Sequence, residues 1–477
     1  MKKKTGMILF VAACLAICLI PFACMTFART DTRIGNEREV AFPSLTTKDN
    51  GFNTEILEEL GSYFEQHFAF RPQLLSVDAE IQSNAFGVSN ADTVIKGQNG
   101  WLYYNSTLDD YLGENTLSAR GMWNLAHNIS LMQDYVEKND AKFLLMIPPN
   151  KNTLYGENMP YYDRYAVGTV RNRDLLQPAL EKAGVAYLDL FSLFRDQEEV
   201  LYLKGDSHWN NKGALLVYNT ALDQLQKDHD DYSDVPVVRK KETYGDLTTI
   251  LYPTTAKPDW DYTYQYTQDY HYVTDTASVE DSHIETANSQ TSDRLLMYRD
   301  SFGNTLLPFF ANAFETACFS KSIPYNLVND VTLYQPDYVV VEKVERNLRE
   351  FVETPAVLPA PEVKLHDSDA QELSGATVTA EICEANMLYY AFSGEVTTGV
   401  QEETQIYLRL TDAAGVTKTY EAFTTTSGDS DNGFLVYLPR SQFDDPAGNH
   451  TVTAAVLTKT GETVAVAANQ VLTLPQE

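Results

Sequence analysis

Basic residues are scarce in this sequence, and their scarcity bears on the protein's partners. Lys and Arg total 36 against 66 Asp and Glu, which gives the 477 residues a formal net charge of −30. A protein that binds duplex nucleic acid neutralises phosphates with basic side chains. The charge balance therefore predicts that nucleic acid is not a partner.

Cysteine is also scarce, and its distribution excludes further classes of protein. Cys14, Cys18 and Cys24 lie in one apolar stretch near the N-terminus, so only Cys318 and Cys383 remain for the rest of the chain. This is not the spacing of a disulfide framework, and it contains no Cys-x-x-Cys or Cys/His zinc pattern. The cysteines are thus assigned no redox or metal role, and no cofactor is predicted for the chain.

The overall composition is that of a globular protein. Hydrophobic residues make up 44% of the chain, aromatic residues 12% and charged residues 21%. These values exclude a disordered or collagen-like chain. Since the length is roughly three times that of an average domain, we expect two or three domains with well-buried cores.

A long apolar run near the N-terminus predicts a membrane segment. Lysines at positions 2–4 precede an uncharged run over 7–28, which is long enough to cross a bilayer core of about 30 Å as a helix. We expect residues 1–30 to form an uncleaved signal anchor. The alternatives are a signal peptide cleaved after 26–28 (Thr-Phe-Ala) and lipoprotein cleavage before Cys24. Each of them puts the bulk of the protein on the extracytoplasmic face of the membrane.

The region 31–355 alternates apolar runs with stretches of helical spacing. Continuous apolar runs are typical of strands covered on both faces of a parallel sheet, so the predicted fold class is α/β, with a parallel sheet covered by helices. Residues 252–292 lack a clear period and are expected to form an inserted loop or hairpin. The predicted strands are 143–147, 186–190, 295–298 and 338–341, and the predicted helices include 52–64, 123–136, 171–183 and 213–226.

The pattern changes in residues 356–477. The runs 405–410 and 452–456 place apolar side chains at every second position, which predicts a small all-β sandwich. Such a sandwich resembles carbohydrate-binding and immunoglobulin-like modules, and we expect it either to hold a glycan or to act as a spacer. Its alternating strands predict a core of its own, separable from the α/β region. Tyr389, Tyr390 and Phe392 belong either to that core or to a contact with the α/β domain.

Ser301 occupies a position that suits a nucleophile. It follows the apolar run 295–298 and precedes a predicted helix. Ligands bind at the carboxyl ends of parallel strands, and the free N–H groups of a following helix can hold a developing oxyanion. The alternative interpretation is that Asp300 or Ser301 only caps that helix.

Asp206 and His208 form the second candidate group. They are two residues apart in a polar loop before a predicted helix, so in extended backbone their side chains leave the same face. The carboxylate of Asp206 can then orient the imidazole of His208, which becomes a general base toward a serine hydroxyl. The alternatives are a pair of zinc ligands without a recognisable third ligand, and a surface histidine beside a helix cap.

Both groups resemble motifs of a known superfamily. Residues 300–302 (Asp-Ser-Phe) resemble the Gly-Asp-Ser-Leu/Phe nucleophile block of the SGNH hydrolases, and 206–209 (Asp-Ser-His-Trp) resemble the Asp-x-His-Trp block of their alginate O-acetyltransferase-like branch. In that branch, as here, the Asp/His block precedes the Ser block. The similarity is strongest to Gram-positive proteins named for an Asp-His-His-Trp motif, with Ser207 in place of the first histidine. It also includes 64–71, the predicted hairpin 95–104 with its Asn-Gly turn, 149–151 and 245–247.

The resemblance implies a role for each candidate residue. It implies Ser301 as nucleophile, His208 as base and Asp206 as the acid that orients the base. Lys151 and Arg299 are candidates for binding substrate or stabilising the oxyanion, with routine surface charges as the alternative. The implied activity is an extracytoplasmic O-acetyltransferase, which moves an acetyl group through a serine acyl-enzyme to a hydroxyl of an exopolysaccharide or cell-wall glycan.

The resemblance also implies a partner and leaves two other functions open. The implied acetyl donor is a multispanning membrane O-acyltransferase. A glycan acetyl esterase would use the same three residues with water as the acceptor, and the choice depends on which acceptor the closed site admits. A catalytically silent glycan-binding scaffold is the alternative outside the enzymes.

Overall fold

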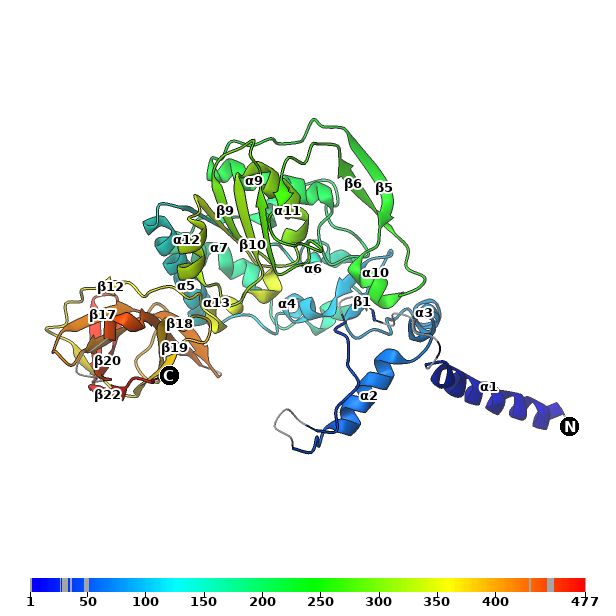
Figure 1. Ribbon diagram of the computed structural model, residues 1–477, viewed down its shortest axis with the longest axis horizontal. Coiled ribbons are helices and arrows are strands. Elements are labelled where there is room, and N and C mark those ends of the chain that lie inside the picture. Colours follow the sequence, from blue (N-terminus) through cyan, green and yellow to red (C-terminus); the bar gives the residue numbers. More distant parts are fainter. Residues whose placement is uncertain are drawn as a thin grey trace.

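The chain is arranged as an N-terminal arm, an α/β domain and a β-sandwich (Figure 1). The computed structural model describes residues 2–25, 27, 33–34, 37–46, 51–428, 430–443 and 450–476. The arm contains helices α1 (Lys2–Cys24), α2 (Ile56–His67) and α3 (Arg71–Ile81). In Figure 1 the helices α1 and α2 extend away from the body of the molecule.

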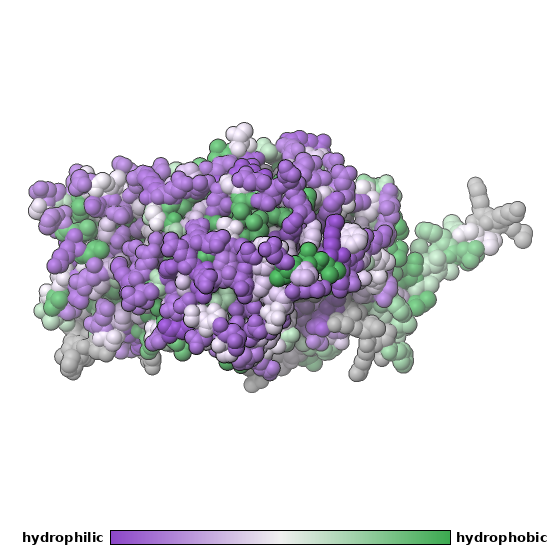
Figure 2. All heavy atoms as spheres, turned by 90° about the horizontal axis from the view of Figure 1, so that it is seen from above, coloured by the Kyte–Doolittle hydropathy of each residue, from purple (hydrophilic) through white to green (hydrophobic). Residues whose placement is uncertain are grey.

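Helix α1 is the apolar segment that the sequence predicts. Within Lys4–Cys24 its most apolar window has a mean hydropathy of 2.8 and is 6% buried, so the helix is long and apolar enough to cross a membrane. Figure 2 shows α1 as an apolar projection beside a largely hydrophilic face. A cleavable signal sequence near the N-terminus can also meet this criterion of length and hydropathy. Thr26, Ala28 and the predicted boundary after residue 30 lie outside the described residues.

A seven-stranded sheet forms the centre of the α/β domain. Its order is β4-β3-β11-β9-β10-β8-β7, in which the first five strands are parallel and the last two pair antiparallel. Four strands are the predicted apolar runs, and the sequence reasoning missed β10 and did not resolve β7 and β8. The strands are β3 (Lys142–Met146), β4 (Tyr187–Leu188), β7 (His271–Tyr272), β8 (His283–Ala287), β9 (Arg294–Tyr298), β10 (Thr316–Ser320) and β11 (Tyr338–Glu342).

Helices cover both faces of this sheet, which explains why its central strands β3, β9 and β11 are largely apolar. Phe143 and Leu145 pack against one group of helices and Leu144 and Met146 against the other, because successive side chains of a strand point to opposite faces. The first group is α5 (Ala119–Lys138), α7 (Asn172–Ala183) and α12 (Leu327–Tyr334), and the second is α9 (Asn211–Leu225) and α11 (Gly303–Ala313). Shorter helices are α4 (Leu108–Leu112), α6 (Lys151–Leu154), α8 (Leu190–Arg195), α10 (Asp246–Leu251) and α13 (Glu350–Glu353).

Two hairpins flank the central sheet. The predicted one consists of β1 (Val94–Lys96) and β2 (Leu102–Tyr104), joined through Asn99 and Gly100, which both have positive φ as an Asn-Gly turn requires. The other pairs β5 (Val237–Thr243) with β6 (Asp259–Tyr264) and carries α10 between its strands. This hairpin begins at Val237, before the start of the predicted insertion at 252–292. Strand β8, which lies near the end of the predicted insertion, belongs to the central sheet.

The C-terminal region is the sandwich that the alternation predicts, and with it the predicted fold class is confirmed. Ile406, Leu408 and Leu410 point into its core together with Val452 and Val456. One sheet contains β12 (Glu362–Val363), β13 (Gln371–Leu373), β16 (Gln405–Thr411), β17 (Thr417–Glu421), β20 (Thr451–Thr460), β21 (Thr463–Ala467) and β22 (Gln470–Thr473). The other contains β14 (Ala376–Ile382), β15 (Tyr389–Val396), β18 (Phe423–Ser427) and β19 (Ser430–Pro439).

The sandwich is joined to helix α5 by apolar and polar contacts. The side chain of Asn128 donates to the carbonyl of Thr424 (2.9 Å) and accepts from its N–H (3.0 Å). Arg120 donates to the carbonyl of Thr404 at 2.7 Å. Tyr389 is buried in the core around α5, whereas Tyr390 and Phe392 lie in the sandwich's own core. The sandwich was expected to be separable, but at this junction it shares a core with the α/β domain.

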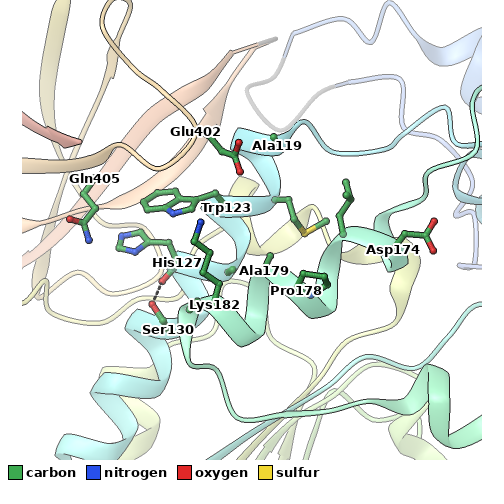
Figure 3. Close-up of a pocket in the computed structure, with 14 residues that line it drawn as sticks. Ala119, Trp123, His127, Ser130, Asp174, Pro178, Ala179, Lys182, Glu402 and Gln405 are labelled. Carbon is green, nitrogen blue, oxygen red and sulfur yellow. Dashed lines mark hydrogen bonds between the residues drawn. The ribbon is translucent and has the colours of Figure 1, made fainter. Parts of the chain in front are cut away.

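A cavity of about 530 Å³ lies at the same junction (Figure 3). Figure 3 shows Trp123 and His127 on α5 beside Lys182 on α7, with Glu402 and Gln405 of the sandwich at the rim. The imidazole of His127 stacks on the indole of Trp123 at 4.7 Å. The residues that line this cavity do not include Asp206, His208 or Ser301, so it is separate from the candidate active site.

Candidate active site

Ser301 lies in the turn between strand β9 and helix α11. Its neighbour Asp300 holds this turn, since one carboxylate oxygen accepts from the N–H of Phe302 and the other from the N–H of Val344, both at 2.8 Å. The N-cap residue of α11 is Phe302 and no side chain caps this helix in the described structure, so the alternative in which Asp300 or Ser301 caps it is not observed. The hydroxyl of Ser301 remains available for another partner.

That partner is His208. Its Nε2 lies 2.8 Å from Oγ of Ser301, and its Nδ1 lies 2.7 Å from Oδ1 of Asp206. The same carboxylate oxygen accepts from the backbone N–H of His208 at 2.9 Å, which fixes the loop in the conformation that brings both side chains to one face. The structure therefore brings Asp206, His208 and Ser301 into one continuous chain, the arrangement required of an acid, a base and a nucleophile.

The two ionisable groups favour each other's charged forms. Burial opposes ionisation of Asp206, but the hydrogen bond and positive charge of His208 outweigh it and hold the pKa of Asp206 below its usual range. Burial also opposes protonation of His208, and the bond to Asp206 again outweighs it, so the pKa of His208 is raised. Asp206 can thus stabilise the imidazolium that forms when His208 takes a proton from Ser301.

Trp209 connects the base to the nucleophile turn. Its indole N–H donates to the hydroxyl of Thr305 on α11 at 2.6 Å, and its ring packs edge-on against Phe302 at 4.9 Å. The Phe302 ring in turn lies 4.7 Å from the His208 ring. Since Trp209 follows the base and Phe302 follows the nucleophile, these contacts hold the two loops in a fixed relation.

Asp246 is a residue of the site to which the sequence reasoning assigned no role. Its N–H donates to Oδ2 of Asp206 at 2.9 Å, its own Oδ1 accepts from the N–H of Ser207 at 2.8 Å, and Ser207 also donates its hydroxyl to Oδ2. Oδ2 of Asp246 lies 3.8 Å from Nδ1 of His208. Burial and the nearby Asp206 raise the pKa of Asp246. The segment Gly245-Asp246-Leu247 belonged to the family resemblance, which was the one signal in the sequence.

Glycines allow the loop of Asp206 and the loop of Asp246 to meet. A Cβ at Gly245 would lie 2.2 Å from the carbonyl oxygen of Gly205, so only glycine permits this approach. The backbone N–H of Thr248 then donates to the same carbonyl at 2.9 Å. Asp206, His208 and Asp246 place ligand atoms within 4.8 Å of one another, a spacing that a metal ion could use. The oxygens of the two carboxylates already accept from four backbone N–H groups and from the Ser207 hydroxyl, so each carboxylate oxygen has a protein partner.

Lys151 has a different place from the one expected. It is 3% exposed, and its Nζ donates to the carbonyls of Leu203 (3.1 Å), Lys204 (3.0 Å) and Asp206. An ammonium has three donors, and all three are used within the protein. These contacts argue against direct binding of substrate or oxyanion, and they make Lys151 a residue that positions the Asp206 loop. Burial lowers the pKa of Lys151 to about 8.

Arg299 is likewise internal. It is 2% exposed, and its guanidinium donates to the side chain of Asn304 and to the carbonyls of Val279 (2.8 Å) and Asp281 (3.1 Å). These bonds tie the segment before β8 to the nucleophile turn, so the expected substrate contact is replaced by support of that turn. A Cβ at Gly303 would lie 2.7 Å from Cβ of Arg299, which explains the glycine at the start of α11.

The backbone N–H of Ser301 suits the role of oxyanion donor. Within the described part of the chain it donates to no protein acceptor, whereas the N–H groups of Asp300 and Phe302 on either side are both bonded to carboxylates. A free N–H beside the nucleophile is where a tetrahedral intermediate places its oxyanion.

Comparison with known proteins identifies a family that resembles this chain. Residues 94–295 match the family described as the SGNH hydrolase-like domain of the acetyltransferase AlgX. Over those residues the chain is similar to an SGNH hydrolase-like domain of the alginate O-acetylase-like branch. The match covers Asp206 and His208 and ends six residues before Ser301. The branch is the one that the motif resemblance indicated.

Individual relatives share parts of the chain. Over 224 residues it is 27% identical to the probable alginate O-acetylase AlgJ of Pseudomonas syringae pv. tomato, a match that covers 43% of this chain and 52% of that protein. The chain thus spans about half the length of this curated relative. Among solved structures, Bacillus cereus PatB1 is 16% identical, with 54% of this chain and 96% of that chain covered and a TM-score of 0.43. A DHHW family protein from Eubacterium siraeum is 16% identical, with 54% and 95% covered and a TM-score of 0.40.

Proposed function

We propose that this protein is an extracytoplasmic, serine-dependent O-acetyltransferase that acetylates a hydroxyl of an exopolysaccharide or cell-wall glycan. The observation that carries the proposal is the chain of hydrogen bonds from Asp206 through His208 to Ser301, at the carboxyl end of a parallel strand. The match to an acetyltransferase-type SGNH domain supports the choice of the acetyl group. The name of the curated relative, an alginate O-acetylase, supports a polysaccharide as the acceptor.

The geometry supports a two-step transfer. In the first step Nε2 of His208 takes the proton of Ser301, and Oγ attacks the carbonyl carbon of the donor's acetyl ester. The tetrahedral oxyanion forms beside the N–H of Ser301, and Asp206 stabilises the imidazolium. His208 then returns the proton to the departing oxygen of the donor, which leaves an acetyl ester on Ser301.

The second step repeats the first with another oxygen. His208 takes the proton of a glycan hydroxyl, whose oxygen attacks the acetyl-enzyme, and Ser301 leaves as its oxygen recovers that proton. The products are an O-acetyl glycan and free enzyme. If water enters in place of the glycan, the same steps give acetate, so an acetyl esterase is the alternative function.

Helix α1 supports the location and the origin of the acetyl group. Attached by this helix, the catalytic domain would remain at the extracytoplasmic surface of the cell membrane. A multispanning membrane O-acyltransferase can deliver the acetyl group there. Acetyl transfer from such a partner needs no soluble cofactor in this chain.

A chromogenic acetyl ester tests the proposal, with and without an oligosaccharide acceptor. We expect wild-type protein to release the chromophore, to gain the mass of one acetyl group on Ser301 and to pass it to the oligosaccharide. Ser301→Ala should do none of these. Ser130→Ala is a matched control, because its hydroxyl bonds only to the main chain of α5, away from the triad. Acetate as the sole product would favour the esterase, and unaltered turnover by Ser301→Ala would refute the nucleophile.

A further inference from the structure

Arg346 lies beside the candidate active site. It belongs to the short 3-10 helix Glu345–Asn347, which follows strand β11. The centre of its guanidinium lies 5.9 Å from the centroid of the Phe302 ring and 5.3 Å from that of Tyr104. Since the Phe302 ring lies 4.7 Å from the His208 ring, Arg346 belongs to the surroundings of the base and the nucleophile.

The guanidinium of Arg346 has no polar partner among the described residues. It carries five N–H donors, and no hydrogen bond or ion pair uses them within that part of the chain. The adjacent Glu345 does not neutralise it, because that carboxyl group is buried and accepts from the N–H of Asn150 (2.8 Å) and the hydroxyl of Thr153 (2.7 Å). The positive charge of Arg346 acts at longer range on Asp110 and His208, where it favours the deprotonated form of each group.

Packing on two rings orients this group without using its donors. A guanidinium stacks on aromatic faces while its N–H fork stays free at the edge, and that fork matches a carboxylate or phosphate with two parallel bonds. Arg346 is half-buried, so an anion that reaches it binds in a partly desolvated position, where a charge-assisted bond is strong.

We propose that Arg346 binds an anionic group, a carboxylate or a phosphate, of the acceptor glycan and so brings its hydroxyl to Ser301. This role rests on the proposed function, because it takes the acceptor to be a glycan. The chain has a net charge of −30 and repels an acidic polymer at long range. A guanidinium that no described residue neutralises therefore makes binding depend on where the polymer's acidic group lies. Arg346 is then a specificity-determining residue.

The experiment compares three acceptors of similar length: a neutral oligosaccharide, an oligouronate and a phosphate-bearing oligosaccharide. The donor is a chromogenic acetyl ester, and the proteins are full-length wild type, Arg346→Gln, Arg346→Lys and Arg164→Gln. Arg164 is the matched control, because its exposed guanidinium also lies over two rings, those of Tyr161 (4.7 Å) and Tyr165 (5.0 Å), away from the triad.

We expect Arg346→Gln to raise KM for one of the acidic acceptors by roughly 10- to 100-fold, the loss typical of a charged hydrogen-bond donor. Its kcat should change much less, KM for the neutral acceptor should stay within about threefold, and Arg346→Lys should be intermediate because it keeps the charge without the fork. The acceptor that loses affinity identifies carboxylate or phosphate. Equal losses for neutral and acidic acceptors, or no change in KM for either acidic one, would overturn the assignment.

Failure of the proposed function is distinguishable from failure of this role. If wild-type protein transfers acetyl to none of the acceptors, dissociation constants of the same oligosaccharides are measured by calorimetry. Weaker binding of an acidic oligosaccharide to Arg346→Gln still supports the role, and equal binding refutes it. If Arg346→Gln does not fold, as judged by circular dichroism, Arg346→Lys against wild type decides in the same assays.

Discussion

Replacement of Lys151 by methionine would separate its positioning role from the substrate contact first expected. Methionine keeps the length and apolar character of the lysine stem but removes the ammonium. The carbonyls of Leu203, Lys204 and Asp206 then lose their shared donor, and the loop that presents Asp206 to His208 is held less firmly.

The size of the effect follows from those bonds. Hydrogen bonds to a charged group contribute about 1.5–3 kcal/mol each, so three contribute about 4.5–9 kcal/mol. Burial of the ammonium opposes them: its pKa falls from 10.5 to about 8, which corresponds to about 3.5 kcal/mol at about 1.4 kcal/mol per pKa unit. Lys151→Met should therefore lower the free energy of unfolding by about 1–6 kcal/mol. The same loosening should lower kcat by about tenfold or more, because small displacements of catalytic groups are costly.

The assay measures Tm, kcat and KM for a chromogenic acetyl ester. We expect Tm and kcat to fall together while KM stays within about threefold. Lys227→Met is the matched control: this lysine is also buried, and its Nζ lies 3.2 Å from Asp293, away from the triad, so its loss should lower Tm without lowering kcat of the folded protein. A raised KM with unchanged Tm and kcat in Lys151→Met would refute the positioning role and restore the substrate contact.

Three further changes probe the site and its surroundings. Because the pKa of His208 is raised above 6.5 and the neutral imidazole is the base, kcat/KM should fall as the pH drops through that raised pKa. Asp206→Asn should move this midpoint to lower pH and reduce the plateau by roughly 10³- to 10⁴-fold, and an unmoved midpoint in the pH–rate profile would contradict the pairing. Asp246→Asn should also lower the midpoint but reduce kcat only about tenfold, since Asp246 lies 3.8 Å from Nδ1, and a loss as large as that of Asp206→Asn would make it the principal acid. Truncation after residue 355 should strip Asn128 of both bonds to Thr424 and expose the apolar face of α5, giving insoluble protein or a large fall in Tm. Soluble truncated protein with wild-type ester turnover would show that the sandwich is separable after all.

Much of the architecture follows from local patterns in the sequence. The four apolar runs became strands of the central sheet because both sides of a helix-covered sheet must be apolar. The spacing of Asp206 and His208 was enough to predict their contact, since residues two apart in extended backbone share a face. The position of Ser301 after an apolar strand likewise predicted a nucleophile at the carboxyl end of that strand.

Other features depend on contacts that no local pattern encodes. Ser301 and His208 are 93 residues apart, and their loops meet because α9 and α11 share one core and Trp209 contacts Thr305 and Phe302. Lys151 and Arg299 were expected at the substrate because their charge is visible in the sequence, whereas most of the acceptors they bind are main-chain carbonyls, which every residue has. The partner of a buried cation is therefore set by the path of the backbone. For the same reason, only the tertiary structure revealed the role of Asp246 and the packing of the sandwich against α5. Both depend on backbone groups from segments that are distant in the sequence.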